Sequence, residues 1–124
     1  MAVLLVVGEA SLRSQWSEQL QGARFRVTAL GTEDEARLYL QSFTPSVVVY
    51  HATDDGDDTR RFLYDVSVRE SGPQIPVVVL TASPASRRLA EGCGCTVLAL
   101  PTDDEHFCAE LTRLAPQSRR PAPR

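Results

Sequence analysis

The sequence contains no lysine. All thirteen of its basic residues are arginine, so mechanisms that need an ε-amine, such as a P-loop lysine or a Schiff base, are excluded. The formal net charge is −3 over 124 residues. Because there is no excess of basic residues, the sequence argues against nucleic acid or an anionic membrane surface as a partner.

Long hydrophobic runs are also missing. The apolar run at residues 2–7 is far shorter than the roughly 18 residues of a membrane span, and it lacks the flanks of a signal peptide. We therefore expect a cytoplasmic protein that does not contact a membrane. With 124 residues, of which 43% are hydrophobic and 23% charged, the chain is long enough for one globular domain with a buried core.

Only three cysteines are present, Cys93, Cys95 and Cys108. An odd number without a framework spacing predicts reduced thiols rather than structural disulfides. The Cys93-Gly94-Cys95 segment offers a redox pair or a metal ligand pair, but C-x-C lacks the spacing of a zinc or thioredoxin-like motif. We therefore expect incidental thiols, with no metal and no cofactor.

Five short β-branched or aliphatic runs recur along the chain, at residues 3–7, 25–30, 46–50, 76–80 and 96–100. Three of them are apolar almost throughout, which is typical of strands covered on both faces. A segment with helical periodicity follows each run. Strict alternation of strand and helix predicts an α/β fold, a doubly wound parallel sheet of five strands with helices on both faces.

The predicted helices have recognisable starts and apolar faces. Thr32 with Glu35 three residues later is a capping box, and Ser83-Pro84 is typical of an N-cap followed by proline at the first helical position. The residues expected to face the core are Leu12, Trp16 and Leu20 in the first helix, Ala36, Tyr39, Leu40 and Phe43 in the second, Phe62, Leu63 and Val66 in the third, and Phe107, Leu111 and Leu114 in the fifth.

The end of the chain differs from the rest in composition and hydrophobic pattern. Residues 117–124 carry two prolines and no apolar periodicity. We predict one domain over residues 1–115, followed by a flexible tail or linker over residues 116–124.

Ligands of parallel sheets bind beyond the carboxyl ends of the strands. The residues that follow the predicted strands there include Gly8, Glu9, His51, Thr81, Ala82, Leu100 and Pro101. No glycine-rich dinucleotide fingerprint follows the first run, and the sequence has no serine-hydrolase or zinc-protease motif.

Residues 2–115 resemble the receiver domains of bacterial two-component response regulators, the CheY-like members of the flavodoxin-like folds. The segments that carry the resemblance are LLVVGE at 4–9, PSVVVYH at 45–51, IPVVVLTA at 75–82 and VLALP at 97–101. In the family the first of these segments ends in two acidic residues and the second ends in the phosphorylated aspartate. The third carries a hydroxyl residue, and the fourth carries a lysine followed by a cis-forming proline. The resemblance implies the strand order 2-1-3-4-5 and a role in phosphorelay signalling.

The chain departs from the family at the phosphorylation site. His51 stands at the phosphoacceptor position, Leu100 at the lysine position and Gly8 at the first acidic position. The residues that keep the family character are Glu9, Thr81 and Pro101. Aspartyl phosphorylation needs a carboxylate nucleophile, Mg²⁺ and a neutralising lysine. Because the carboxylates and the lysine of the phosphorylation site are missing together, no uncompensated charge is left there. This pattern favours a pseudo-receiver that acts through protein contacts and is not an enzyme.

His51 has several possible roles. It is a candidate phosphoryl acceptor or metal ligand, but we favour a side chain that fills the vacated crevice and is hydrogen-bonded there. If Glu9 pairs with it, the pKa of His51 should be raised, because a nearby carboxylate favours the charged ring.

An acidic stretch at residues 54–58 follows the third run. It fails the spacing of an EF-hand calcium loop. We therefore expect a solvated loop in which Asp57 or Asp58 caps the third helix.

The resemblance implies that protein partners, including a second copy of the chain, bind the surface of the fourth helix, fifth strand and fifth helix. The residues expected on this face are Arg87, Arg88, Val97 and Phe107. Arginine is enriched in interface hot spots, which supports this assignment.

Two other functions remain open. One is a small-molecule or metal sensor that uses the vacated crevice around Gly8, His51 and Thr81, where glycine allows close approach of a ligand to the backbone. The other is phosphoryl transfer to His51 or to a loop aspartate. We rank phosphoryl transfer last, because the sequence offers no group to neutralise the charge of the phosphoryl group.

Overall fold

The computed structural model of the chain describes residues 2–53, 56–67 and 75–118. Five parallel strands form one sheet in the order β2-β1-β3-β4-β5. The strands are β1 (Ala2–Val6), β2 (Arg26–Leu30), β3 (Val47–His51), β4 (Val77–Thr81) and β5 (Thr96–Ala99), and the helices are α1 (Ala10–Gly22), α2 (Glu33–Ser42), α3 (Asp57–Ser67), α4 (Pro84–Gly92) and α5 (Asp104–Ser118). The predicted fold class and strand order are confirmed.

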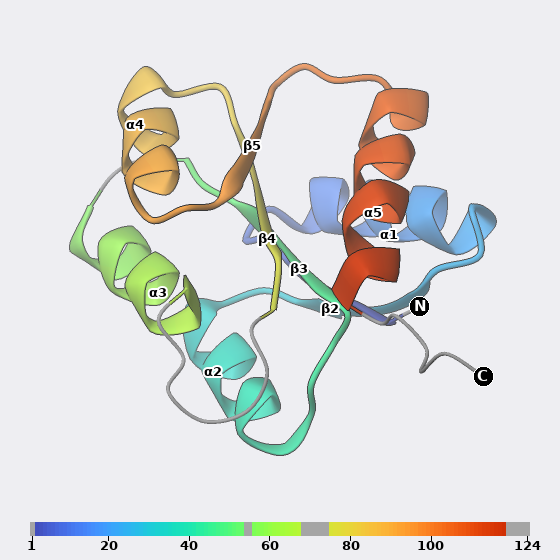
Figure 1. Ribbon diagram of the computed structural model, residues 1–124, viewed down its shortest axis with the longest axis horizontal. Helices are drawn as coiled ribbons and strands as arrows, with labels where there is room; N and C mark the ends of the chain where they lie inside the picture. Colours follow the sequence, from blue (N-terminus) through green and yellow to red (C-terminus); the bar gives the residue numbers. More distant parts are fainter. Residues whose placement is uncertain (1, 54–55, 68–74, 119–124) are drawn as a thin grey trace.

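Helices cover both faces of the sheet. The helices α1 and α5 lie on one face, and α2, α3 and α4 lie on the other (Figure 1). Side chains along a strand alternate between faces, so on β1 Val3 and Leu5 pack with α1 and α5, whereas Leu4 and Val6 pack with the other three helices. Burial on both faces is the reason that the central strands are continuous apolar runs.

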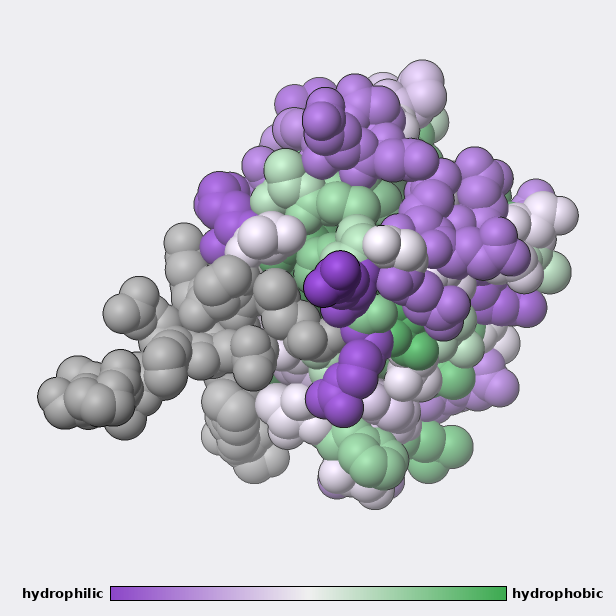
Figure 2. All heavy atoms as spheres, turned by 90° about the vertical axis from the view of Figure 1, so that its right-hand side faces the viewer, coloured by the Kyte–Doolittle hydropathy of each residue, from purple (hydrophilic) through white to green (hydrophobic). Residues whose placement is uncertain are grey.

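Most of the predicted helix faces are confirmed. The predicted core residues that are buried are Trp16 and Leu20 on α1, Phe107 and Leu111 on α5, Ala36 on α2, and Phe62, Leu63 and Val66 on α3. Figure 2 looks at the side of the molecule where α1 and α5 lie, and hydrophilic side chains cover much of it. Within the described ranges, no helix combines the length and apolar character that crossing a membrane requires.

The helix starts use the predicted caps, with one variation. Thr32 accepts a hydrogen bond from the Glu35 N–H at 3.1 Å, and Ser83 accepts one from the Ser86 N–H at 3.2 Å. The Glu35 carboxylate accepts a hydrogen bond from the N–H of Gly31, at 3.1 Å, one residue before the cap. These bonds satisfy donors that a helix start leaves without partners.

Two predictions about helix ends are wrong. Phe43 is 59% exposed, because it is the C-cap that follows the last residue of α2, and its ring stacks on that of Tyr39. Asp57 and Asp58 lie inside the first turn of α3 rather than capping it, where the positive end of the helix dipole favours their charge. The helix α5 ends at Ser118, and residues 119–124, most of the predicted tail, lie outside the described part of the chain.

A glycine-dependent turn ends α4 and leads into β5. The N–H of Gly94 donates to the carbonyl of Glu91 at 3.1 Å, and the N–H of Cys95 donates to the carbonyl of Ala90 at 3.0 Å. This pair of bonds is the Schellman arrangement, which requires a left-handed residue between them. Gly94 supplies it with φ +81°.

We expect Gly94→Ala to lower the free energy of unfolding by about 1–2 kcal/mol, because a side chain disfavours the left-handed region. No atom lies within 4 Å of a Cβ placed at Gly94 or at Gly92, so crowding contributes at neither position. Gly92→Ala is therefore the matched control, and it should raise stability slightly because Gly92 lies in the helix. Urea unfolding of both variants tests this; equal effects would contradict it.

Candidate functional site

A cavity of about 460 Å³ lies beyond the carboxyl ends of β1, β2 and β3. The described residues that line it are Val6, Gly8, Glu9, Gly31, Glu33, Tyr50, His51, Thr53, Gly56, Asp57, Asp58 and Thr59. The structure thus brings together Gly8, Glu9 and His51, three residues of the predicted crevice. It also adds the loop after β2 and the start of α3, which the sequence did not lead us to expect there. Asp54 and Asp55 lie outside the described residues.

The described lining of the cavity is acidic. Glu9, Glu33, Asp57 and Asp58 line it, and none of the described lining residues is an arginine. The expectation that acids and base disappear together from this crevice is therefore wrong. Glu33 comes from α2 and the two aspartates come from α3, so the carboxylates reach the cavity from different elements.

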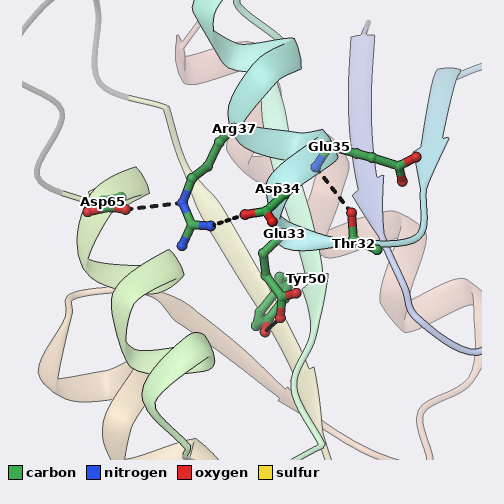
Figure 3. A network of polar contacts seen from close by, with 7 residues as sticks. All are labelled: Thr32, Glu33, Asp34, Glu35, Arg37, Tyr50 and Asp65. Atoms are coloured by element: carbon green, nitrogen blue, oxygen red, sulfur yellow. Dashed lines mark hydrogen bonds and ion pairs between the residues drawn. The ribbon is translucent and has the colours of Figure 1, made fainter.

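Glu33 is held by a hydrogen bond to the sheet. Tyr50 and Glu33 lie side by side (Figure 3), and the Tyr50 hydroxyl donates to the Glu33 carboxylate at 2.7 Å. The same hydroxyl lies 3.3 Å from the Thr59 hydroxyl. Tyr50 itself is 3% exposed, with its ring 4.8 Å from that of Phe62. A charge-assisted bond of this kind is among the stronger hydrogen bonds in proteins, so it fixes one carboxylate at the wall of the cavity.

An ion-pair network joins the two helices that carry these acids. The Arg37 guanidinium of α2 contacts Asp34 at 2.9 Å and Asp65 of α3 at 3.2 Å (Figure 3). It also lies over the Phe62 ring, 5.7 Å from the ring centroid. Its Nη2 atom is buried without a hydrogen-bond partner among the described residues. Both aspartates are well exposed, so the pairs add little stability, but they tie α2 to α3 beside the cavity.

Glu9 is committed to the start of α1. Its carboxylate accepts a hydrogen bond from the Leu12 N–H at 2.8 Å and so caps the helix. Gly8 is exposed just before it, and a Cβ there would meet only the Gly31 carbonyl oxygen, at 3.7 Å.

His51 stands at the end of β3 and packs against an aromatic side chain of α1. The imidazole meets the Trp16 ring edge-on, with centroids 5.3 Å apart and an interplanar angle of 89°. Trp16 in turn meets Phe107 of α5 at 6.3 Å. The ring of His51 therefore borders the cavity and also belongs to the aromatic contacts between the sheet, α1 and α5.

The predicted rise in the pKa of His51 is wrong. Burial lowers its pKa below the usual 6.5, and the charge of Glu9, which raises it, is the smaller effect. The physical reason is that half-burial against apolar rings disfavours the imidazolium more than one exposed, capping carboxylate favours it.

The other predicted crevice residues form a separate group. Thr81 is buried and its hydroxyl accepts a hydrogen bond from the Ser83 N–H at 3.0 Å, while the N–H of Leu100 donates to the Thr81 carbonyl at 2.9 Å. The peptide bond between Leu100 and Pro101 is cis, as the resemblance implies. None of the three lines the cavity.

The expected partner face is partly present at the surface. Arg87 and Arg88 are exposed on α4, and Arg87 contacts Glu91 at 3.3 Å. Val97 is half-buried. Phe107 is 2% exposed and packs in the core, so its assignment to this face is wrong. Its helical position follows the apolar stripe of α5, which already predicts burial.

Sequence reasoning missed Glu33, and a signal for it existed. The loop after the second run lies at the same edge of a parallel sheet as the loops after the others. Inspecting residues 31–33 would have found this carboxylate. Tyr50 and Thr59 carry no such signal, because their contact depends on how α3 packs on the sheet.

The described lining of the cavity does not present a ligand set for a divalent cation. Among the described residues, no three His, Cys, Asp or Glu side chains are arranged to hold a metal ion. Glu9 uses its carboxylate as a helix cap, and His51 contributes an imidazole rather than an oxygen ligand. Mg²⁺ prefers several oxygen ligands in octahedral geometry, and the described lining does not present such a set.

No protein-family model and no curated protein matches the sequence. Solved structures do match along nearly the whole chain. The receiver domain of a signal transduction histidine kinase from Syntrophus aciditrophicus has a TM-score of 0.84 at 17% identity, covering 98% of this chain and 94% of that chain. The chain has the receiver-domain fold.

Two other receiver folds give similar values. The receiver domain of a sensor histidine kinase from Pseudomonas aeruginosa has a TM-score of 0.81 at 19% identity, covering 92% of this chain and 96% of that one, and holds a magnesium ion in its active-site cleft. The chemotaxis response regulator CheY4 of Vibrio cholerae has a TM-score of 0.78 at 22% identity, covering 91% and 97%.

We expect stability to fall as the pH is lowered through about 6.5, the model-peptide pKa of histidine. The unfolded state then binds a proton that His51 in the folded state binds more weakly, so protonation favours unfolding, and the loss is complete below the folded-state pKa. His51→Gln should remove this part of the pH dependence.

Chemical unfolding of wild type and variant between pH 7.5 and about 5 measures the difference. His106→Gln is the control, because His106 is the other histidine and is exposed on α5. If His51→Gln keeps the wild-type pH dependence, the assignment to His51 is wrong.

Proposed function

We propose that the chain is a pseudo-receiver, a cytoplasmic signalling domain that acts through protein contacts, without aspartyl phosphorylation and without enzymatic activity of its own. One observation carries the proposal. At the end of β3, where receiver domains have the phosphorylated aspartate, this chain places an imidazole edge-on against Trp16. An aspartyl phosphate needs a carboxylate oxygen as nucleophile, and His51 has none.

The electrostatics of the cavity also support the proposal. A transferred phosphoryl group brings negative charge that a cation must neutralise. Here the lysine position is Leu100, and the described lining of the cavity holds four carboxylates and no arginine. A phosphoryl group entering this space would be repelled.

The test is an amide NMR spectrum of labelled protein, titrated with Mg²⁺ and then with beryllofluoride, which mimics a phosphorylated aspartate. We expect no beryllofluoride-dependent shifts, because the mimic needs a carboxylate at residue 51. Beryllofluoride shifts centred on Glu9, His51 and Thr81 would contradict the proposal.

A gain-of-function variant makes the negative result informative. Gly8→Asp, His51→Asp and Leu100→Lys together restore the acidic, acceptor and lysine positions of the family on the same fold. This triple variant should show saturable beryllofluoride shifts that need Mg²⁺. If the triple variant folds but shows no beryllofluoride-dependent shifts, features of the fold other than these three positions prevent beryllofluoride binding.

We also propose that the outer surface of α4 and β5 contacts a protein partner, with Arg87 and Arg88 as its charged residues. Both side chains are exposed and lie on one short helix at the β5 side of the sheet. Exposed arginines contribute to interface hot spots when a partner covers them.

Arg87→Glu with Arg88→Glu should weaken partner binding at least about tenfold, a loss of roughly 1.4 kcal/mol, and leave the melting temperature unchanged. Binding is measured by quantitative pull-down with tagged wild-type and variant chains, and self-association by analytical ultracentrifugation. Arg24→Glu with Arg26→Glu is the matched control, because those exposed arginines lie at β2, the opposite edge of the sheet. Unchanged binding would place the partner surface elsewhere.

A second candidate function is a sensor for a small ligand. The observation in its favour is the cavity itself, whose volume of about 460 Å³ is within the range of small-molecule sites. Its carboxylates favour a positively charged ligand. Shifts with Mg²⁺ alone, confined to the cavity lining and equal in the His51→Gln variant, would favour this candidate over the first.

A further inference from the structure

The three free thiols lie on two different faces of the sheet. Cys93 and Cys95 pack against the cluster formed with α2, α3 and α4, whereas Cys108 packs against the cluster formed with α1 and α5. All three are partly exposed. Since the sheet separates Cys108 from the other two, only Cys93 and Cys95 lie where they can react with each other in the folded chain.

The turn after α4 holds these two cysteines together. Cys93 is the C-cap of the helix, and Gly94, with φ +81°, reverses the chain so that the Cys95 N–H donates back to the Ala90 carbonyl. Residues two apart have Cα atoms at most about 7 Å from each other even when extended, and the turn shortens this separation. A disulfide needs Cα atoms about 4.4–6.8 Å apart, a range that two residues on either side of a one-residue turn can reach.

The surroundings of Cys95 lower its reactivity as a nucleophile. The Cys95 sulfur lies 3.5 Å from the Ser67 hydroxyl at the end of α3. Burial raises the pKa of Cys95, the Ser67 bond lowers it, and the neighbouring charge of Cys93 raises it further. A raised pKa leaves a smaller share of Cys95 as thiolate, so Cys95 is the weaker first nucleophile.

We propose that Cys93 and Cys95 form a redox modification site, a dithiol that hydrogen peroxide converts into an intramolecular disulfide across the C-terminal turn of α4. The Cys93 thiolate attacks one peroxide oxygen and breaks the O–O bond, which gives a sulfenic acid and, with one proton, water. The Cys95 sulfur then attacks the Cys93 sulfur, loses its proton and releases the sulfenic oxygen as a second water. The two thiols are oxidised by two electrons, the peroxide is reduced, and small thiols reverse the change by exchange.

The experiment treats reduced full-length chain with stoichiometric hydrogen peroxide, blocks remaining thiols with an alkylating reagent, and measures intact and peptide masses. We expect a loss of about 2 Da confined to the peptide with both cysteines, restored by dithiothreitol. Cys93→Ser and Cys95→Ser should each lower the yield of this product at least about tenfold. Cys108→Ser is the matched control and should keep the wild-type yield, because Cys108 is on the opposite face.

Two further readouts can contradict the proposal. In Cys95→Ser the sulfenic acid on Cys93 has no resolving thiol, so dimedone should trap it, while circular dichroism shows that the variant is folded. The proposal fails if peroxide gives a sulfinic acid at Cys93, about 32 Da heavier, with Cys95 still free to alkylate. It also fails if the product is a disulfide-linked dimer.

Discussion

Burial of the central strands on both faces is the constraint on which the rest of the structure depends. The strands β1, β3 and β4 have almost no exposed side chain, because helices cover each face. Each of their large apolar side chains is worth about 1.5–3 kcal/mol when fully buried. Parallel pairing of these strands then requires that all their carboxyl ends meet at one edge. The cavity lies at that edge, where the loops after the strands leave the packed layers.

The described lining of this edge carries negative charge that comes largely from α2 and α3, and it offers no fixed cation to balance that charge. At the end of β3, the imidazole of His51 packs against Trp16 and its pKa is lowered by burial. His51 thus has a packing role, because its ring lines the cavity and also contacts Trp16 of α1, which in turn contacts Phe107 of α5.

Prediction from the sequence succeeded where periodicity or capping decides the outcome. The alternation of strands and helices, the buried residues of α1 and α3, and the caps at Thr32 and Ser83 follow from local patterns, whereas the strand order 2-1-3-4-5 was implied by the resemblance to receiver domains. It failed at Phe43, which continues the apolar stripe of α2 but lies past the last turn that reaches the sheet. It also failed for the pKa of His51, because desolvation depends on neighbours from another element.

The sequence by itself determined the fold class, the absence of a lysine and the histidine at the end of the third strand, since these depend only on residue type and spacing along the chain. Tertiary structure decided which carboxylates share the cavity, that Glu9 caps α1, and that Cys93 and Cys95 lie on the face opposite to Cys108. The physical reason is that local patterns set the direction of each element, whereas contacts between elements arise only when helices pack onto a twisted sheet.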